Sequence, residues 1–118
     1  FIVTNQSGIG RGYFKVEDME LFHSALLFEF SKNDIKIEDI NFCPHSPDDN
    51  CVCRKPHPKM ILDLAKKHSI DLSKSYMIGD KVIDGECGLN AGCTGILLKV
   101  ADARFKRFDS LSEFAEYL

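Results

Sequence analysis

One stretch decides the fold class of this chain: Tyr76-Met77-Ile78-Gly79-Asp80-Lys81-Val82. Residues 76–78 have the composition of a short buried strand, and a Gly-Asp turn follows them directly. An apolar helical pattern then runs over 82–91, and Gly92 is suited to end that helix. Another short apolar run covers 94–98. A strand, a helix and a strand in this order predict an α/β unit with parallel strands.

The same alternation extends toward both ends of the chain. Apolar runs over 1–3 and 40–43 predict two further strands, and helical spacing predicts helices over 16–31, over 58–68 and from Ser110 onward. Leu21, Leu27 and Phe28 widen the apolar stripe of the helix over 16–31, which we therefore expect to be well buried. The glycine-bearing segment 7–12 is expected to be a flexible turn. Residues 1–118 are therefore predicted to form a single α/β domain with a mostly parallel sheet.

Composition restricts the classes of protein to consider. The chain has 118 residues, a net charge of −3 and a hydrophobic content of 44%. No apolar run approaches the roughly 20 residues that span a bilayer. The negative charge disfavours nucleic-acid binding, so a bound anion must meet local positive charge. The five cysteines are odd in number and partly clustered, which favours a reducing compartment over a disulfide framework. We expect a cytoplasmic protein without nucleic-acid or membrane partners.

Four soft metal donors gather in the loop after the predicted strand over 40–43. Thiolate and imidazole groups in this number are typical of a tetrahedral zinc site, and four protein ligands leave no open position for substrate. We therefore expect structural zinc, the alternative being free thiols in a loop. The donors fall within eleven residues and are Cys43, His45, Cys51 and Cys53.

Polar groups follow several of the predicted strands. In parallel sheets ligands bind beyond the carboxyl ends of the strands. The turn 4–7 offers hydroxyls and amides that can cradle phosphate, although ordinary turn chemistry would also use them. Asp80 suits Mg²⁺, which takes one or two protein carboxylates. Asp84 is a second candidate ligand, and the alternative for both Asp80 and Asp84 is that they are first-turn acids favoured by the helix N-terminus. Arg54 and Lys55 lie next to the metal loop. The planar guanidinium of arginine and the compact ammonium of lysine can both bind an anion, the alternative being that the two are solvated surface cations.

Together these motifs resemble the haloacid-dehalogenase (HAD) superfamily of phosphatases, and more narrowly its heptose-bisphosphate and histidinol-phosphate phosphatase branch. Residues 4–12, Thr-Asn-Gln-Ser-Gly-Ile-Gly-Arg-Gly, look like the second motif of the family. The loop 43–56 looks like the zinc loop of that branch, which leads into the third motif. The segment 77–84, followed by 90–92, looks like the fourth. The resemblance covers nearly the whole chain and implies a three-layer α/β/α fold.

The resemblance also implies roles for individual residues. Lys55 and Thr4 would stabilise the phosphoryl group during transfer, and Asp80 would bind Mg²⁺. Zinc would be structural, and the protein would be a monomer. The residues implied in substrate binding are Asn5, Gln6, Ser7, Arg54 and Lys81. The implied reaction is Mg²⁺-dependent removal of the 7-phosphate from D-glycero-D-manno-heptose 1,7-bisphosphate.

The chain departs from the family pattern in one respect. Residues 1–118 contain no Asp-x-Asp motif before a Gly-Thr-like turn, which in this family carries the nucleophile and the general acid/base. The resemblance places that motif on a central strand before Phe1. We therefore expect a preceding segment in the natural protein, and no turnover by a chain that begins at Phe1.

Other functions remain open on the residues alone. The short spacing of five residues between His45 and Cys51 looks like the histidinol-phosphatase branch, whereas 7–12 favours heptose. A catalytically inactive, zinc-stabilised binding module is the alternative from a different class. A nucleic-acid 3′-phosphatase would share the superfamily, but the net negative charge disfavours it.

Overall fold

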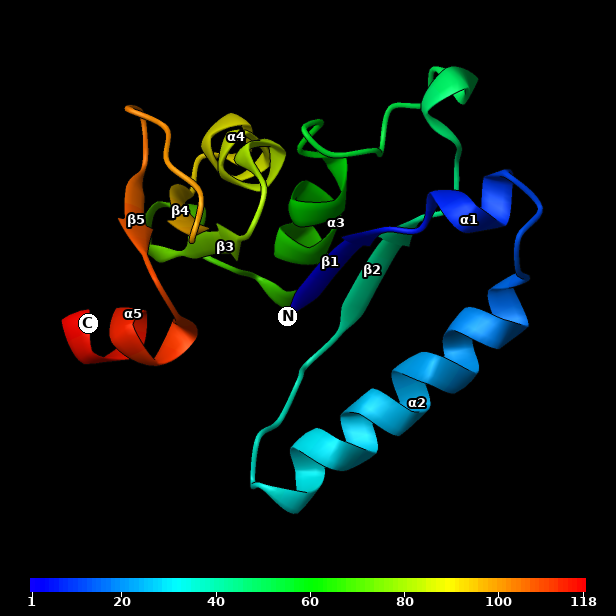
Figure 1. The fold of residues 1–118 in the computed structure, drawn as a ribbon, viewed down its shortest axis with the longest axis horizontal. Coiled ribbons are helices and arrows are strands. Elements are labelled where there is room, and N and C mark those ends of the chain that lie inside the picture. Colours follow the sequence, from blue (N-terminus) through cyan, green and yellow to red (C-terminus); the bar gives the residue numbers. More distant parts are fainter. The chain divides into compact units, whose positions relative to one another are not determined.

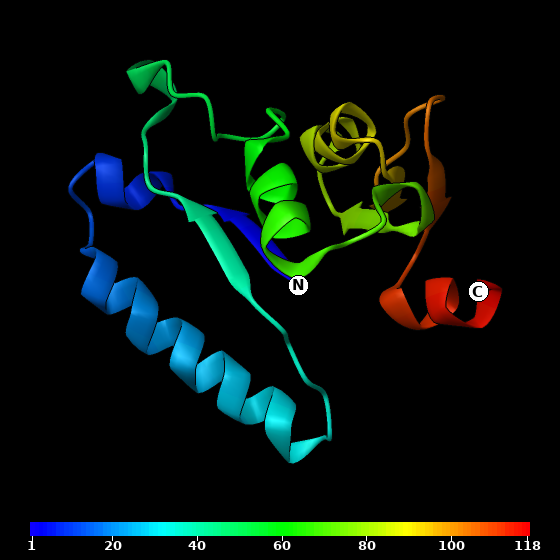
Figure 2. The same ribbon diagram turned by 180° about the vertical axis from the view of Figure 1, so that it is seen from behind.

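The computed structural model describes all 118 residues and contains two compact units, Phe1–Arg54 and Lys55–Leu118. Figures 1 and 2 draw both units from opposite sides. All of the strand pairings are parallel, as the sequence predicts. None of the helices combines the length and the hydropathy that crossing a membrane requires.

The first unit is built on two parallel strands. Strand β1 (Ile2–Asn5) pairs with β2 (Ile40–Cys43), so that Thr4 lies opposite Phe42 and Asn5 opposite Cys43. A short helix, α1 (Ser7–Gly10), and a long one, α2 (Val16–Lys32), connect the two strands. Figure 1 shows α2 as one continuous helix. A 3₁₀ turn (Pro47–Asp49) follows β2 in the metal loop.

Two expectations for this unit are wrong. The segment 7–12 is not simply a flexible turn, because its first four residues form α1. Helix α2 has the predicted bounds to within a residue but is mostly exposed: only Met19 is buried, while Leu21 and Phe22 are 72% and 63% exposed. The apolar spacing sets the helix periodicity, but burial needs a neighbouring surface that no local pattern reveals.

The second unit is a three-stranded parallel sheet with helices on both faces. Its strands, β3 (Tyr76–Gly79), β4 (Thr94–Leu98) and β5 (Lys106–Phe108), pair in the order β3-β4-β5. Helix α4 (Val82–Ala91) packs on one face and α5 (Leu111–Tyr117) on the other (Figures 1 and 2). Helix α3 (Lys59–His68) contacts α4, and a 3₁₀ turn (Leu72–Lys74) leads into β3.

The core between α5 and the sheet is aromatic. Ile96, Phe108 and Phe114 are buried together. The rings of Phe108 and Phe114 pack edge to face, with their centroids 5.4 Å apart. Burying one phenylalanine side chain contributes about 1.5–3 kcal/mol. Helix α5 begins where the sequence predicts, because the Ser110 hydroxyl accepts the Glu113 N–H. Packing of Phe114 against Phe108 therefore holds the short helix α5 against the sheet.

The sequence misses one strand of this sheet. Strand β5 has only three residues, two of which are Lys106 and Arg107, so it shows no apolar run. Its pairing with β4 places Phe108 opposite Leu98, and that pairing is tertiary. Helix α4 and strand β4, by contrast, have the predicted bounds, because Gly92 adopts a φ of 93° and ends the helix at once.

Candidate active site and metal cluster

In the second unit an ion pair joins the residue that follows the metal loop to the start of α4. The Lys55 ammonium donates to Asp84 Oδ1 at 2.6 Å, and the two side chains are only 12% and 6% exposed. The other carboxylate oxygen accepts the Lys81 backbone N–H at 3.1 Å, which caps the helix. The carboxylate therefore holds the Lys55 ammonium and begins α4 at the same time.

This contact settles the role of Asp84 that the sequence leaves open. A Cβ atom at Gly79 would overlap its carboxylate, so the glycine lets the side chain approach the end of β3. Both oxygens are used within the protein, one by Lys55 and one by Lys81. Asp80, in contrast, is exposed directly after β3. Asp80 rather than Asp84 therefore suits a hard cation, which needs only one or two protein carboxylates.

Two hydrogen bonds fasten the segment around Lys55 to α4. The Asn90 side chain donates to the Pro56 carbonyl at 3.1 Å, and the Cys87 thiol donates to the His57 carbonyl at 3.3 Å. The family resemblance includes Asn90 in the fourth motif without giving it a role, and sequence reasoning does not single out Cys87 as part of the site. Each lies 30 or more residues from its partner in the sequence, so no local pattern indicates the contact.

Arg54 carries an unsatisfied donor. Its side chain is partly buried, and its Nη1 atom is buried without a hydrogen-bond partner in the structure. Buried polar atoms nearly always have partners, so such an atom needs an explanation. A guanidinium with a spare N–H is suited to a carboxylate or phosphate oxygen. The observation fits the anion-binding role that the sequence suggests for Arg54.

In the first unit the turn after β1 rests on the backbone of the metal loop. Thr4 and Asn5 end the strand, and the Gln6 side chain donates to the Thr4 hydroxyl at 3.1 Å. The Gln6 N–H also donates to the Cys43 carbonyl at 2.8 Å, and the Gly10 N–H donates to Pro44. All four residues of the turn 4–7 are partly exposed, so their polar groups are accessible.

Glycine is required where α1 meets this loop. A Cβ atom at Gly10 would overlap the Pro44 carbonyl oxygen and the Ser46 backbone nitrogen. The end of α1 therefore packs directly against the backbone of the metal loop around His45. The turn after β1 and the metal loop therefore form one packed structure within the first unit.

The structure brings together the four predicted metal donors. Their ligand atoms all lie within 4.8 Å of one another. Cys53 Sγ is 2.8 Å from Cys43 Sγ and 3.2 Å from His45 Nδ1, and Cys51 Sγ is 3.5 Å from Cys43 Sγ. Zinc binds thiolate sulfur at about 2.3 Å and imidazole nitrogen at about 2.0 Å. The composition and convergence of this cluster fit zinc, with modest outward movement of the closest sulfurs.

Two of these thiols differ in acidity. Burial, together with hydrogen bonds from neighbouring thiols, raises the pKa of Cys43 to about 12. Desolvation also raises the pKa of Cys51, but hydrogen bonds from the Arg54 backbone and from neighbouring thiols outweigh it and lower that pKa to about 7. Zinc would bind both as thiolates and displace their protons.

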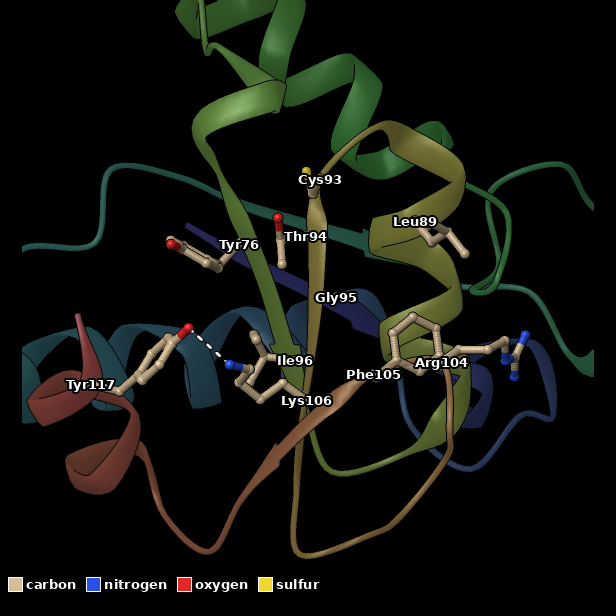
Figure 3. A pocket seen from close by; sticks show the side chains of 10 residues that line it. All are labelled: Tyr76, Leu89, Cys93, Thr94, Gly95, Ile96, Arg104, Phe105, Lys106 and Tyr117. Carbon is tan, nitrogen blue, oxygen red and sulfur yellow. Dashed lines mark hydrogen bonds between the residues drawn. The ribbon is translucent and has the colours of Figure 1, made fainter.

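The second unit also contains a cavity of about 390 Å³. Figure 3 shows Tyr76 and Tyr117 on one side of β4, and Phe105 and Arg104 on the other. The Lys106 ammonium donates to the Tyr117 hydroxyl at 2.9 Å. The cavity lies at the amino ends of the strands, because Tyr76 and Lys106 begin β3 and β5. Asp80 follows the opposite, carboxyl end of β3, so within the second unit this cavity is separate from Asp80.

Comparison with known proteins points to one family. Residues 52–106 match the HAD-hydrolase-like family model. The chain is 39% identical over 121 residues to "D-glycero-alpha-D-manno-heptose-1,7-bisphosphate 7-phosphatase" of Campylobacter jejuni, which spans 99% of this chain and 69% of the relative. It is 46% identical over 101 residues to "D-glycero-beta-D-manno-heptose-1,7-bisphosphate 7-phosphatase" of Helicobacter pylori (strain J99), spanning 82% of this chain and 56% of that relative.

A relative with a different name and a solved structure extend the comparison. The chain is 43% identical over 98 residues to "Histidine biosynthesis bifunctional protein HisB" of Buchnera aphidicola, which spans 83% of this chain and 28% of the relative. The D,D-heptose 1,7-bisphosphate phosphatase of Bordetella bronchiseptica, solved in complex with magnesium and phosphate, superposes with a TM-score of 0.90 at 29% identity. That match covers 98% of this chain and 70% of the solved chain.

The matches to the Campylobacter jejuni relative and to the Bordetella bronchiseptica structure extend over nearly the whole chain. The chain spans little more than half the length of the Helicobacter pylori relatives. The parallel strands, the helices between them and the Gly-Asp turn after β3 agree with the fold that the sequence resemblance implies. Of the four convergent donors, Cys43 ends β2 and the other three follow it, as the resemblance implies for its zinc loop. The chain belongs to the HAD-like hydrolase family.

Proposed function

We propose that these residues are part of a Mg²⁺-dependent phosphomonoesterase that removes the 7-phosphate of D-glycero-D-manno-heptose 1,7-bisphosphate. The observation that carries the proposal is the similarity to relatives with that activity in their names, which extends along 99% of the chain in the Campylobacter jejuni protein. We further propose that residues 1–118 belong to a single domain, and that the protein is a cytoplasmic monomer without nucleic-acid or membrane partners.

Lys55 is proposed to offset the negative charge of the phosphoryl group during transfer. The bond to Asp84 fixes the direction of the Lys55 ammonium. Because the ion pair is largely buried, the ammonium can act in a medium of lower dielectric constant than water, where it interacts strongly with developing charge. Arg54, with its unpartnered Nη1, is proposed to recognise the substrate.

The remaining residues take the roles that the family resemblance implies. The Thr4 hydroxyl is proposed to donate to a phosphoryl oxygen, and Asn5, Gln6 and Ser7 to contact the substrate. Lys81 adds a cation beside Asp80, which is proposed to hold Mg²⁺. Bound Mg²⁺ would supply charge neutralisation at the phosphoryl oxygens. The four-donor cluster after β2 is proposed to bind structural zinc.

The proposal is tested by measuring phosphate release by the whole protein to which these residues belong. With magnesium present, D-glycero-D-manno-heptose 1,7-bisphosphate is expected to be hydrolysed with a higher kcat/KM than histidinol phosphate. Lys55→Ala is expected to lower kcat by about 10²–10³, as when one donor to a transition-state oxyanion is lost. Lys59→Ala is the matched control, because it removes an ion-paired lysine that is half exposed. Full activity in Lys55→Ala would refute the mechanism.

Histidinol phosphate is the second candidate substrate. The Buchnera relative is named for histidine biosynthesis, and the five-residue spacing between His45 and Cys51 resembles the histidinol-phosphatase branch. A higher kcat/KM for histidinol phosphate would replace the heptose proposal and keep the phosphatase mechanism. Tight phosphate binding without turnover of either compound would instead support an inactive binding module.

A further inference from the structure

Two thiols of the metal cluster lie unusually close together. Cys43 Sγ and Cys53 Sγ are 2.8 Å apart, whereas Cys43 Sγ and Cys51 Sγ are 3.5 Å apart. A disulfide has a sulfur–sulfur distance of about 2.05 Å. When zinc does not hold the sulfurs apart, the first pair can therefore form that bond with a relative movement of less than about 1 Å, and the second pair needs a longer movement.

The exposure of the two thiols differs in a way that suits stepwise oxidation. Cys53 is partly exposed, so a small oxidant in solvent can reach it. Cys43 is fully buried beside it, with 0% of its surface exposed. Within this pair, oxidation would therefore begin at Cys53 rather than at Cys43, and Cys43 would be in position to react with the product before solvent thiols can do so.

We propose that Cys43 and Cys53 form a reversible oxidation site that releases zinc when peroxide converts them to a disulfide. Hydrogen peroxide transfers one oxygen to Cys53, giving a sulfenic acid and water. Cys43 Sγ then attacks Cys53 Sγ, the sulfur–oxygen bond breaks, and the second oxygen leaves as water. Because zinc-bound thiolates carry no protons, solvent supplies the two protons that the two waters need. The two thiols are oxidised by two electrons in total, and the peroxide is reduced to two waters.

Closure of this disulfide removes half of the metal donors. Zinc in a structural site uses four protein ligands, and a disulfide sulfur is no longer a thiolate. Only His45 and Cys51 would remain, which is too few to hold the ion firmly. The proposal concerns the state of the thiols and the metal, and it does not depend on which phosphate ester the protein hydrolyses.

The experiment treats the zinc-loaded protein with increasing hydrogen peroxide and measures released zinc with a chromophoric chelator. Zinc release is expected to rise together with the loss of two thiols out of five. Proteolysis before Asp48 separates Cys43 from Cys53, so the disulfide appears in the mass spectrum as two linked peptides. A dithiol reductant is expected to separate the peptides and, with zinc added back, to restore the bound metal. Cys87 and Cys93 are buried and are expected to stay reduced.

Two variants identify the pair. Cys51→Ser and Cys53→Ser each remove one thiolate donor, so they are matched in the number of zinc ligands that remain. The linked peptides are expected to persist in Cys51→Ser and to disappear in Cys53→Ser, and this readout does not require bound zinc. Linkage through Cys51 in the unmodified protein, oxidation to sulfinic acid without linkage, or retention of zinc after oxidation would each overturn the proposal.

Discussion

The buried Lys55–Asp84 pair makes a strong prediction about stability. Asp84→Ala removes the carboxylate that accepts the Lys55 ammonium at 2.6 Å and the Lys81 N–H at 3.1 Å. The Lys55 side chain, only 12% exposed, then loses its buried counter-charge. Desolvation of such a group is expensive when no opposite charge compensates it.

The size of the effect follows from the two lost contacts. A hydrogen bond to a charged group contributes about 1.5–3 kcal/mol. An N-terminal helix cap contributes about 1 kcal/mol. Their sum, about 2.5–4 kcal/mol, agrees with the 3–5 kcal/mol typical of breaking a buried ion pair. A chain of 118 residues has a free energy of unfolding of about 6–18 kcal/mol, so the loss is a large fraction of the total.

Urea unfolding followed by circular dichroism measures this loss. Asp63→Ala is the control, because Asp63 pairs with Lys59 on the surface of α3 and its side chain is 52% exposed. That variant is expected to change the free energy of unfolding by less than about 1 kcal/mol. Adding Lys55→Met to Asp84→Ala is expected to recover part of the loss, because the uncompensated ammonium is then gone. A loss below about 1 kcal/mol in Asp84→Ala, or strictly additive effects in the double variant, would refute the reasoning.

Three further predictions concern the two units. Gly10→Ala is expected to lower the free energy of unfolding by about 1–3 kcal/mol, because the new methyl group overlaps the backbone at Pro44 and Ser46; an unchanged urea midpoint would contradict this. In zinc-free protein at pH 8, iodoacetamide is expected to label Cys51, whose lowered pKa of about 7 makes it mostly thiolate. Cys87, whose pKa burial raises to about 11, should be labelled only after unfolding; equal labelling rates by mass spectrometry would exclude this difference. Chelation of zinc is expected to lower the thermal midpoint, and added zinc to restore it; a midpoint insensitive to zinc would rule out a structural metal.

Local sequence determined much of the architecture and the chemistry. The turn 79–80 between an apolar run and a helical pattern predicts β3 and α4, and the donor spacing from Cys43 to Cys53 predicts the metal cluster that the structure assembles. These features depend on residues close together in the chain. The preferences of these residues can therefore be recognised without knowledge of any long-range contact.

Long-range packing decided the rest. Strand β5 exists because Phe108 packs with Ile96 and Phe114, not because Lys106 and Arg107 favour strands. Nothing within either segment indicates that Lys55 meets Asp84, because the partners are 29 positions apart and only the fold brings the ammonium to the carboxylate. Apolar periodicity predicted the bounds of α2 to within a residue, but most of that helix is exposed. Periodicity fixes which residues share a face, whereas burial and ion pairing depend on which surfaces the folded chain brings into contact.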